Sequence, residues 1–155
     1  QQIRHELKDQ YDFATLASLA RLNKTDEIIN VNDEKFLAPE SMIEAVTSAA
    51  GRTLSVGGMA YLVFNSLAQS YAESLRGLEK LTGETFDTLN IIGGGSKNTL
   101  LNELTKESTG KRVITGPTEG TAIGNLMMQM IGSGELSGVE AGREMITRSF
   151  DVAEV

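Results

Sequence analysis

The chain lacks cysteine and tryptophan, and it has a single histidine and only two prolines among its 155 residues. Without cysteine there is no disulfide and no thiolate metal site, and His5 alone cannot assemble a zinc site. No apolar run approaches the roughly 18 residues that a membrane-spanning helix needs, and the N-terminus lacks the layout of a signal peptide. These absences predict a protein of the reducing cytoplasm that holds no metal in this chain and contacts no membrane.

Positive charge is also scarce. The chain carries 14 lysines and arginines against 21 acidic residues, which gives a formal charge of −7 at pH 7. A nucleic-acid-binding protein needs a basic face to displace counterions from phosphates, so nucleic acid is not expected as a partner. A hydrophobic content of 40% and a charged content of 23% are ordinary for a soluble globular domain. Because the chain begins at Gln1 without a methionine, we expect it to be part of a longer protein.

Helical periodicity dominates the first half of the sequence. Two short helices are predicted within Ile3–Leu22, with a break near Asp12, and residues 30–38 are predicted as a loop. A helix over Glu40–Ala50 follows, with Pro39 expected in its first turn. These segments predict a helical and loop region over residues 1–55.

The longest predicted element is a helix over Val56–Leu81, which opens the second region, residues 56–155. Apolar residues at steps of three and four predict its inward face: Met59, Val63, Leu67, Tyr71, Leu75 and Leu78. Glycine is expected to end the helices, at Gly51, Gly83, Gly110 and Gly132.

Strands and helices alternate after this helix. Strands are predicted over Thr88–Ile92 and Arg112–Thr115, and a helix over Asn98–Thr109 connects them. Another helix follows the second strand, and its inner side is predicted from Ala122, Ile123, Leu126, Met127 and Met130. The S-x-x-E pattern from Ser137 predicts a capping box at the start of a last helix, which extends to about Arg148.

The two predicted strands form an incomplete sheet. A right-handed crossover makes them parallel, and a parallel pair is buried on both faces in most proteins. Two strands are fewer than the roughly four to six that most sheets contain. We therefore expect partner strands from sequence outside this chain, cover from one of the N-terminal helices, or self-association of the isolated chain.

A run of three glycines stands between the first strand and the helix that follows it. Gly93, Gly94 and Gly95 can expose main-chain N–H groups to a ligand, and the positive end of the helix that begins near Asn98 favours an anion. The run is not the phosphate loop G-x-x-x-x-G-K-S/T, and it lacks the G-x-G-x-x-G spacing of a dinucleotide site. A nucleotide cradle of another kind and a simple tight crossover both remain open.

The glycine run and the next strand carry a resemblance to a known family. The segment from Ile91 to Asn102, followed by the segment from Thr109 to Asn125, resembles the C-terminal lobe of the FGGY carbohydrate kinases. The stretch from Asn30 to Met42 and the long helix are also similar, so the resemblance covers nearly the whole chain. It implies an α/β fold, namely part of the C-terminal lobe of the actin-like (ribonuclease H-like) ATPase fold, rich in helix and with a small parallel sheet remnant.

The resemblance also implies a cofactor and a reaction. The intact enzyme would use ATP and Mg²⁺ to phosphorylate a ketose sugar, with ATP in the cleft between two lobes. Gly94 matches the glycine that touches ATP, and Gly93, Gly95 and Asn98 are its neighbours. Gly120 and Gly124 match the helix that follows, where close packing is the favoured role.

The catalytic parts of such a kinase are missing here. The family's N-terminal D-x-G-T/S phosphate loop and its aspartate base have no counterpart, so we expect no catalytic residue in this chain and no activity of the chain alone. The acids Asp33, Glu34 and Glu119 are interpreted as solvated loop or helix-start residues. Two alternatives remain, a kinase of the same family that acts on another sugar and a non-catalytic interaction domain with the same fold.

Overall fold

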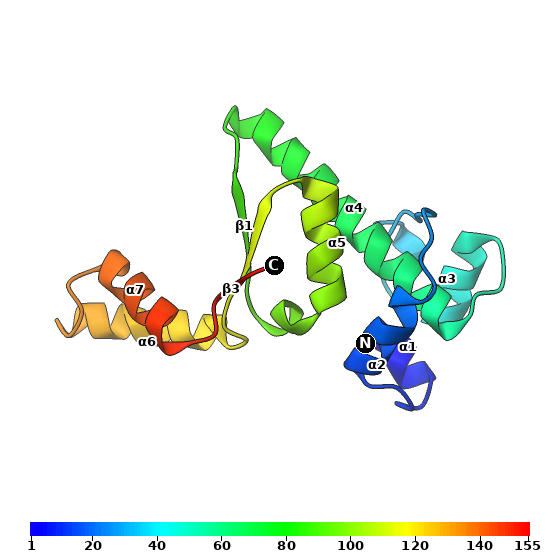
Figure 1. Cartoon of the computed structure of the whole chain (residues 1–155), viewed down its shortest axis with the longest axis horizontal. Helices are drawn as coiled ribbons and strands as arrows, with labels where there is room; N and C mark the ends of the chain where they lie inside the picture. Colours follow the sequence, from blue (N-terminus) through cyan, green and yellow to red (C-terminus); the bar gives the residue numbers. More distant parts are fainter. The chain divides into compact units, whose positions relative to one another are not determined.

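The computed structural model describes all residues, 1–155, and divides into two compact units. The first unit comprises Gln1–Thr85 and Asn98–Gly110, and the second comprises Phe86–Lys97 and Lys111–Val155. The elements of both units are labelled in Figure 1. The chain therefore leaves the first unit, returns to it for one helix, and leaves it again.

The first unit is helical. Its elements are α1 (Gln2–Glu6), α2 (Phe13–Arg21), the 3₁₀ turn η1 (Glu34–Phe36), α3 (Met42–Ala50), α4 (Val56–Thr82) and α5 (Thr99–Thr109). The break predicted at Asp12 is confirmed, because the Asp12 carboxylate accepts a hydrogen bond of 2.7 Å from the Thr15 amide and caps α2. Helices α3, α4 and α5 end at glycines, as predicted.

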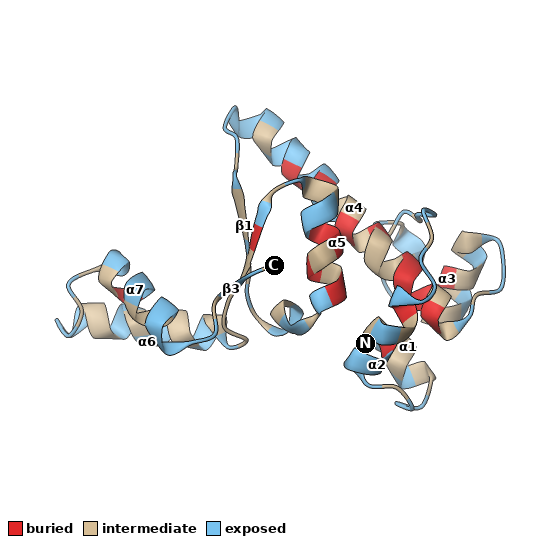
Figure 2. Ribbon diagram, viewed as in Figure 1, coloured by how far each residue is buried: buried red, intermediate tan, exposed pale blue.

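The core of this unit surrounds α4. One cluster joins α4 to α2 and α5 through Ala20, Ala60, Tyr61, Ala68, Leu100 and Leu104, and a second joins α4 to α3 through Val46, Met59 and Leu62. In Figure 2 the buried positions follow α4 and α5. Because α4 is covered from several sides, its buried surface is wider than one stripe.

This arrangement corrects the predicted inward face of α4. Met59 and Leu75 are buried as expected, but Tyr71 is 43% exposed and Leu78 is 52% exposed. The small residues Ala60, Ala68 and Ala72 are buried instead, because they allow the neighbouring helices to approach α4 closely.

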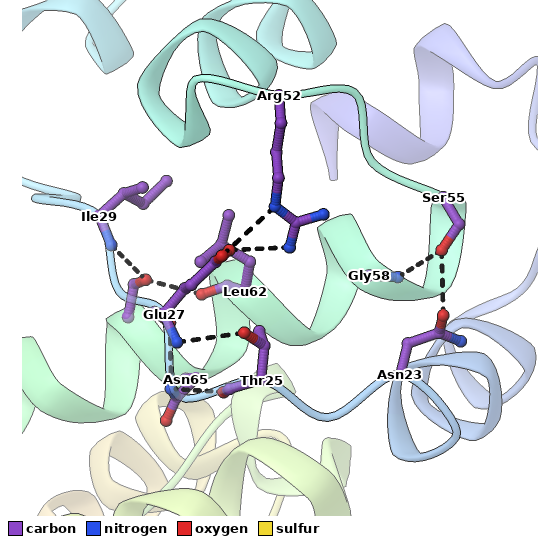
Figure 3. Close-up of polar contacts among 10 residues, drawn as sticks. Asn23, Thr25, Glu27, Ile29, Arg52, Ser55, Gly58, Leu62 and Asn65 are labelled. Atoms are coloured by element: carbon purple, nitrogen blue, oxygen red, sulfur yellow. Dashed lines mark hydrogen bonds and ion pairs between the residues drawn. The ribbon is translucent and has the colours of Figure 1, made fainter.

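Hydrogen bonds attach the extended segment between α2 and η1 to α4 (Figure 3). Asn65 Nδ2 donates to the carbonyl oxygens of Thr25 and Glu27, both at 3.3 Å. The buried Ser66 hydroxyl accepts from the Ile29 amide at 2.9 Å and donates to the Leu62 carbonyl oxygen at 2.7 Å. Three backbone groups of a segment without regular structure thus find their hydrogen-bond partners on α4.

Helix α3 begins two residues later than predicted. Ser41 is its N-cap, with Oγ accepting from the Glu44 amide at 3.1 Å, so Pro39 precedes the helix and does not lie in its first turn. The Glu6 carboxylate of α1 accepts from the Met42 and Ile43 amides at 2.7 and 3.1 Å. These two amides have no intrahelical acceptor, and Glu6 supplies one from another helix.

The second unit contains a small mixed sheet with two helices. Its elements are β1 (Thr88–Ile91), the 3₁₀ turn η2 (Gly94–Lys97), β2 (Arg112–Thr115), α6 (Gly120–Gly132), α7 (Val139–Ser149) and β3 (Ala153–Glu154). Strands β1 and β2 are parallel, with Thr88 opposite Arg112 and Ile91 opposite Thr115. The third strand, β3, pairs antiparallel with β2, so the prediction of only two parallel strands is incomplete.

The predicted burial of α6 is wrong. No residue of α6 is buried, and Leu126 is 57% exposed. The apolar pattern was read correctly as a helix, but its contacts within this unit are few: Met127 lies against the buried Gly142 of α7, and Gly120 lies against Ile92.

The predicted capping box of α7 is also wrong. Gly138 is the N-cap, and no side chain caps the helix. Because α7 begins at Val139, Ser137 lies one residue outside the cap position and cannot reach the amide that a capping box uses.

Candidate functional site

The candidate site lies in the second unit, where the loops after β1 and β2 meet. The Gly93 amide donates to the Pro117 carbonyl oxygen at 3.1 Å, and the Gly116 amide donates to the Ile91 carbonyl oxygen at 2.9 Å. Both loops follow the carboxyl ends of parallel strands, which is where α/β folds bind ligands. The two hydrogen bonds hold the loops together at this edge of the sheet.

Only the first residue of the glycine run has the backbone conformation that glycine favours. Gly93 has φ +82°, whereas Gly94 and Gly95 have no positive φ and belong to the turn η2. Of the three glycines, Gly93 is therefore the one that the backbone conformation of the loop requires. The Gly93 carbonyl oxygen closes the turn by accepting from the amide and the hydroxyl of Ser96, at 3.1 and 2.8 Å.

Gly94 and Gly95 nevertheless leave open space. A Cβ atom built on either residue has no heavy atom within 4 Å, so their lack of a side chain is not explained by packing inside the protein. Space beside the backbone is what a ligand that approaches the loop requires.

A cavity of about 400 Å³ adjoins these loops. It is lined by Ser96 and Lys97 of η2, by the loop Thr115–Glu119, by Ile123 of α6, and by Phe150, Asp151 and Ala153 before and within β3. Cavities that hold small ligands commonly have volumes of about 300–1,000 Å³. The lining combines an apolar part with Lys97, Glu119 and Asp151 as its charged residues, so carboxylates outnumber cations.

The part of the cavity lining formed by Phe150, Asp151 and Ala153 depends on β3. Thr115 is paired with Ala153, and the Thr115 hydroxyl donates to the Ala153 carbonyl oxygen at 3.2 Å. Arg112 Nε and Glu154 Oε2 form an ion pair at 2.7 Å across the same two strands. These contacts hold the preceding residues, Phe150 and Asp151, at the cavity.

None of the four residues predicted to bind the cofactor, Gly93, Gly94, Gly95 and Asn98, lines this cavity. Gly93, Gly94 and Gly95 precede the lining residues Ser96 and Lys97 in the same loop. Asn98 belongs to the first unit, where its Oδ1 accepts from the Leu101 amide at 3.2 Å and caps α5. The structure thus gives Asn98 a local role, and nucleotide contacts of the four residues stay predictions.

The two matching glycines of α6 differ in their surroundings. A Cβ atom on Gly120 would lie 3.3 Å from Ile92 Cβ, whereas one on Gly124 would meet nothing within 4 Å. Close packing against Ile92 therefore explains why residue 120 is a glycine, whereas no packing contact explains the glycine at position 124.

Three of the lining residues, Phe150, Asp151 and Ala153, lie outside every motif that the sequence analysis used. Phe150 and Asp151 come from a segment that has no motif, and they reach the cavity only because the short strand β3 returns to β2. Neither hydrophobic alternation nor turn residues in the sequence mark that strand.

The chain holds no group of three or more histidine, aspartate or glutamate side chains that could bind a metal ion. None of the helices combines the length and the apolar composition of a membrane-spanning segment.

Comparison with known proteins defines the class. The model of the C-terminal domain of the FGGY carbohydrate kinases matches residues 1–133, and the chain belongs to this family. The α/β fold, rich in helix and with a small sheet, agrees with that domain and confirms the predicted fold class.

The similar proteins within this family include several that are named rhamnulokinase. The chain is 40% identical to the rhamnulokinase of Lactiplantibacillus plantarum over 156 residues, covering 97% of this chain and 32% of that protein. It is 38% identical to the rhamnulokinase of Oceanobacillus iheyensis and 35% identical to that of Bacillus subtilis, each covering 98% of this chain and 33% of the relative. The chain thus spans about a third of the length of the curated relatives it matches.

Proposed function

We propose that this chain supplies the adenosine-binding side of the ATP site in a rhamnulokinase-like sugar kinase. The intact enzyme would transfer the γ-phosphate of ATP to the 1-hydroxyl of L-rhamnulose in the cytoplasm. The names of the relatives support this sugar, and another FGGY kinase such as a xylulokinase is the alternative.

The cavity at the carboxyl ends of β1 and β2 is the observation that carries this proposal. It follows the glycine loop, and it lies where α/β folds place nucleotides. Its charges favour the nucleoside over the phosphates, because Glu119 and Asp151 would repel a triphosphate while Lys97 alone would attract it. Carboxylates suit the hydroxyl groups of a ribose, which donate hydrogen bonds to them.

The residues of this chain bind and orient the nucleotide, and they do not perform the chemical step. Phosphoryl transfer needs metal ions, phosphate-binding groups and a residue that positions the attacking hydroxyl. In this proposal the metal ligands and the base belong to the part of the relatives that this chain does not cover. The chain alone is accordingly inactive in this proposal.

The substitution Gly94→Val in the longer kinase tests the proposal. A valine would fill the open space beside the loop, so we expect the KM for ATP to rise at least about tenfold while the KM for the ketose stays unchanged. Gly77→Val, at an exposed and unhindered site on α4, is the matched control and should leave both KM values unchanged. An unaltered KM for ATP in Gly94→Val would overturn the assignment of this loop.

Titration of the 155-residue chain with ATP gives a second test. Only one side of the nucleotide site is present, while the cost of immobilising the ligand remains, so binding should be weak. Calorimetry that measured a submicromolar Kd for the chain alone would contradict the proposal.

A further inference from the structure

We propose that the segment between α7 and β3 selects the nucleoside, with Phe150 stacking against the purine base and Asp151 accepting a hydrogen bond from a ribose hydroxyl. This inference rests on the proposed function, and it assigns a specificity role to two residues that lie beyond the part matching the family model, residues 1–133.

Phe150 is one of the exposed large hydrophobic residues of the chain, and it lines the cavity. It ends α7 with an extended backbone (φ −130°, ψ 158°), its amide donates to the Ile146 carbonyl oxygen at 3.0 Å, and it remains 43% exposed at the cavity. An aromatic side chain loses the free energy of burial when it is left in water. A flat ligand in the cavity would restore that burial, since aromatic rings stack on the face of any nucleobase.

The rest of the apolar lining supports a base at this place. Pro117 and Ile123 line the same cavity as Phe150, and they come from the second loop and from α6. Three elements thus contribute apolar side chains to one cavity. This composition fits a purine, whose faces are apolar and whose edges carry the polar atoms.

Asp151 adds a hydrogen-bond acceptor to this apolar lining. Its side chain is exposed and has neither a hydrogen bond nor an ion pair in the structure. A carboxylate without a partner can accept hydrogen bonds at both of its oxygens, and the ribose of a nucleotide presents hydroxyl donors. Next to Phe150 in the chain, it places an acceptor beside the proposed stacking surface.

The pairing of β3 with β2 fixes this segment. Because Thr115 opposes Ala153 and Arg112 pairs with Glu154, the short segment before β3 that carries Phe150 and Asp151 has little freedom to leave the cavity. A stacking surface that is held in advance loses less conformational entropy when the nucleotide binds.

Steady-state kinetics of the longer kinase test the inference, with the variants Phe150→Ala, Phe150→Tyr and Asp151→Asn. We expect Phe150→Ala to raise the KM for ATP about tenfold, with kcat and the KM for the ketose unchanged, and Phe150→Tyr to remain near the parent enzyme. Asp151→Asn should reduce the preference for ATP over 2′-deoxy-ATP, because the amide is a weaker acceptor than the carboxylate.

The outcomes separate this inference from the proposed function. If Gly94→Val raises the KM for ATP and Phe150→Ala does not, the nucleotide site stands and the role of Phe150 is overturned. If Phe150→Ala and Phe150→Tyr lower thermal stability and alter both KM values together, the residue serves folding and the inference fails. If neither Gly94→Val nor Phe150→Ala changes the KM for ATP, the proposed function fails as well.

Discussion

Ile92 lies directly over Gly120, so that a Cβ atom on that glycine would come within 3.3 Å of Ile92 Cβ. Gly116 is equally close, because a Cβ atom there would lie 3.1 Å from Ile92 Cγ2. One side chain from the end of the first strand therefore fills the space that two glycines leave in the loop and helix after the second. The contact adds packing to the two backbone hydrogen bonds between these loops.

Substitution of Gly120 should show this contact. Gly120→Ala crowds Ile92, so we expect it to reduce the free energy of unfolding of the 155-residue chain by about 1 kcal/mol. In an Ile92→Ala background the same change should cost much less, which a double-mutant cycle by urea unfolding measures. Gly124→Ala, in the same helix with nothing within 4 Å, is the control and should stabilise by about 0.5–1 kcal/mol. Equal effects of Gly120→Ala in both backgrounds would show that the contact is unimportant.

Helix α2 approaches α4 closely at Gly57. A Cβ atom on Gly57 would lie 2.5 Å from the Leu19 carbonyl oxygen, which is backbone and cannot move alone. We expect Gly57→Ala to destabilise the chain by about 2 kcal/mol or more, because the two helices must separate. Gly77→Ala in the same helix meets no atom within 4 Å and should stabilise by about 0.5–1 kcal/mol. Thermal unfolding of both variants checks the contrast, and a tolerated Gly57→Ala would refute the close packing.

Glu6 makes the stability of the first unit depend on pH. Partial desolvation raises the pKa of Glu6, but hydrogen bonds from the Met42 and Ile43 amides and from the Ser41 hydroxyl lower it, and the net pKa lies below its ordinary value. The folded state therefore binds this proton less readily than the unfolded state does. The stabilisation is complete above the ordinary glutamate pKa of about 4.3, and it is lost as the pH falls through the lower pKa of the folded state.

The variant Glu6→Gln tests this dependence. We expect it to lower stability at pH 7 and to flatten the decrease in stability below about pH 4.3. Urea unfolding across pH 3–7, about the range in which carboxylates titrate, gives the measurement. Glu40→Gln is the control, because Glu40 forms no hydrogen bond or ion pair and lies close to the same helix. Parallel pH profiles for the parent chain and Glu6→Gln would contradict the prediction.

Strand β1 has an open edge. It pairs only with β2, so the backbone groups on its other side have no strand partner within the chain. Exposed edges pair with other chains, and we expect the isolated 155-residue chain to self-associate. Sedimentation velocity at rising concentration measures this. A strict monomer, together with rapid amide exchange along β1, would be the opposite result.

The sequence predicted the elements that are coded locally. Helix α4 was placed within one residue because apolar periodicity and Gly83 define it, and β2 was placed at its observed bounds. Asp12 and Asn98 are the N-caps of α2 and α5, a position that aspartate and asparagine favour.

Long-range packing could not be read in the same way. Helical periodicity gave α6 an inner face, but nothing in the pattern says whether a partner covers it, and Leu126 remains exposed. Strand β3 has only two residues, Ala153 and Glu154, and it exists because β2 offers them a partner. The glycine loop of the candidate site was found from the sequence, whereas Phe150 and Asp151 needed that distant pairing.

The late position of β3 also sets an order for biosynthesis. Thr115 and Ala153, which are paired, stand 38 residues apart, and all of α6 and α7 is made between them. The helices around α4 can pack on a ribosome as soon as α5 has left the exit tunnel, because a chain folds as its segments emerge. Phe150 and Asp151, by contrast, cannot reach the cavity until β3 has been made and has paired with β2. Translation that terminated between β2 and β3 would release a chain with a folded helical core and a glycine loop but without Phe150 at the cavity.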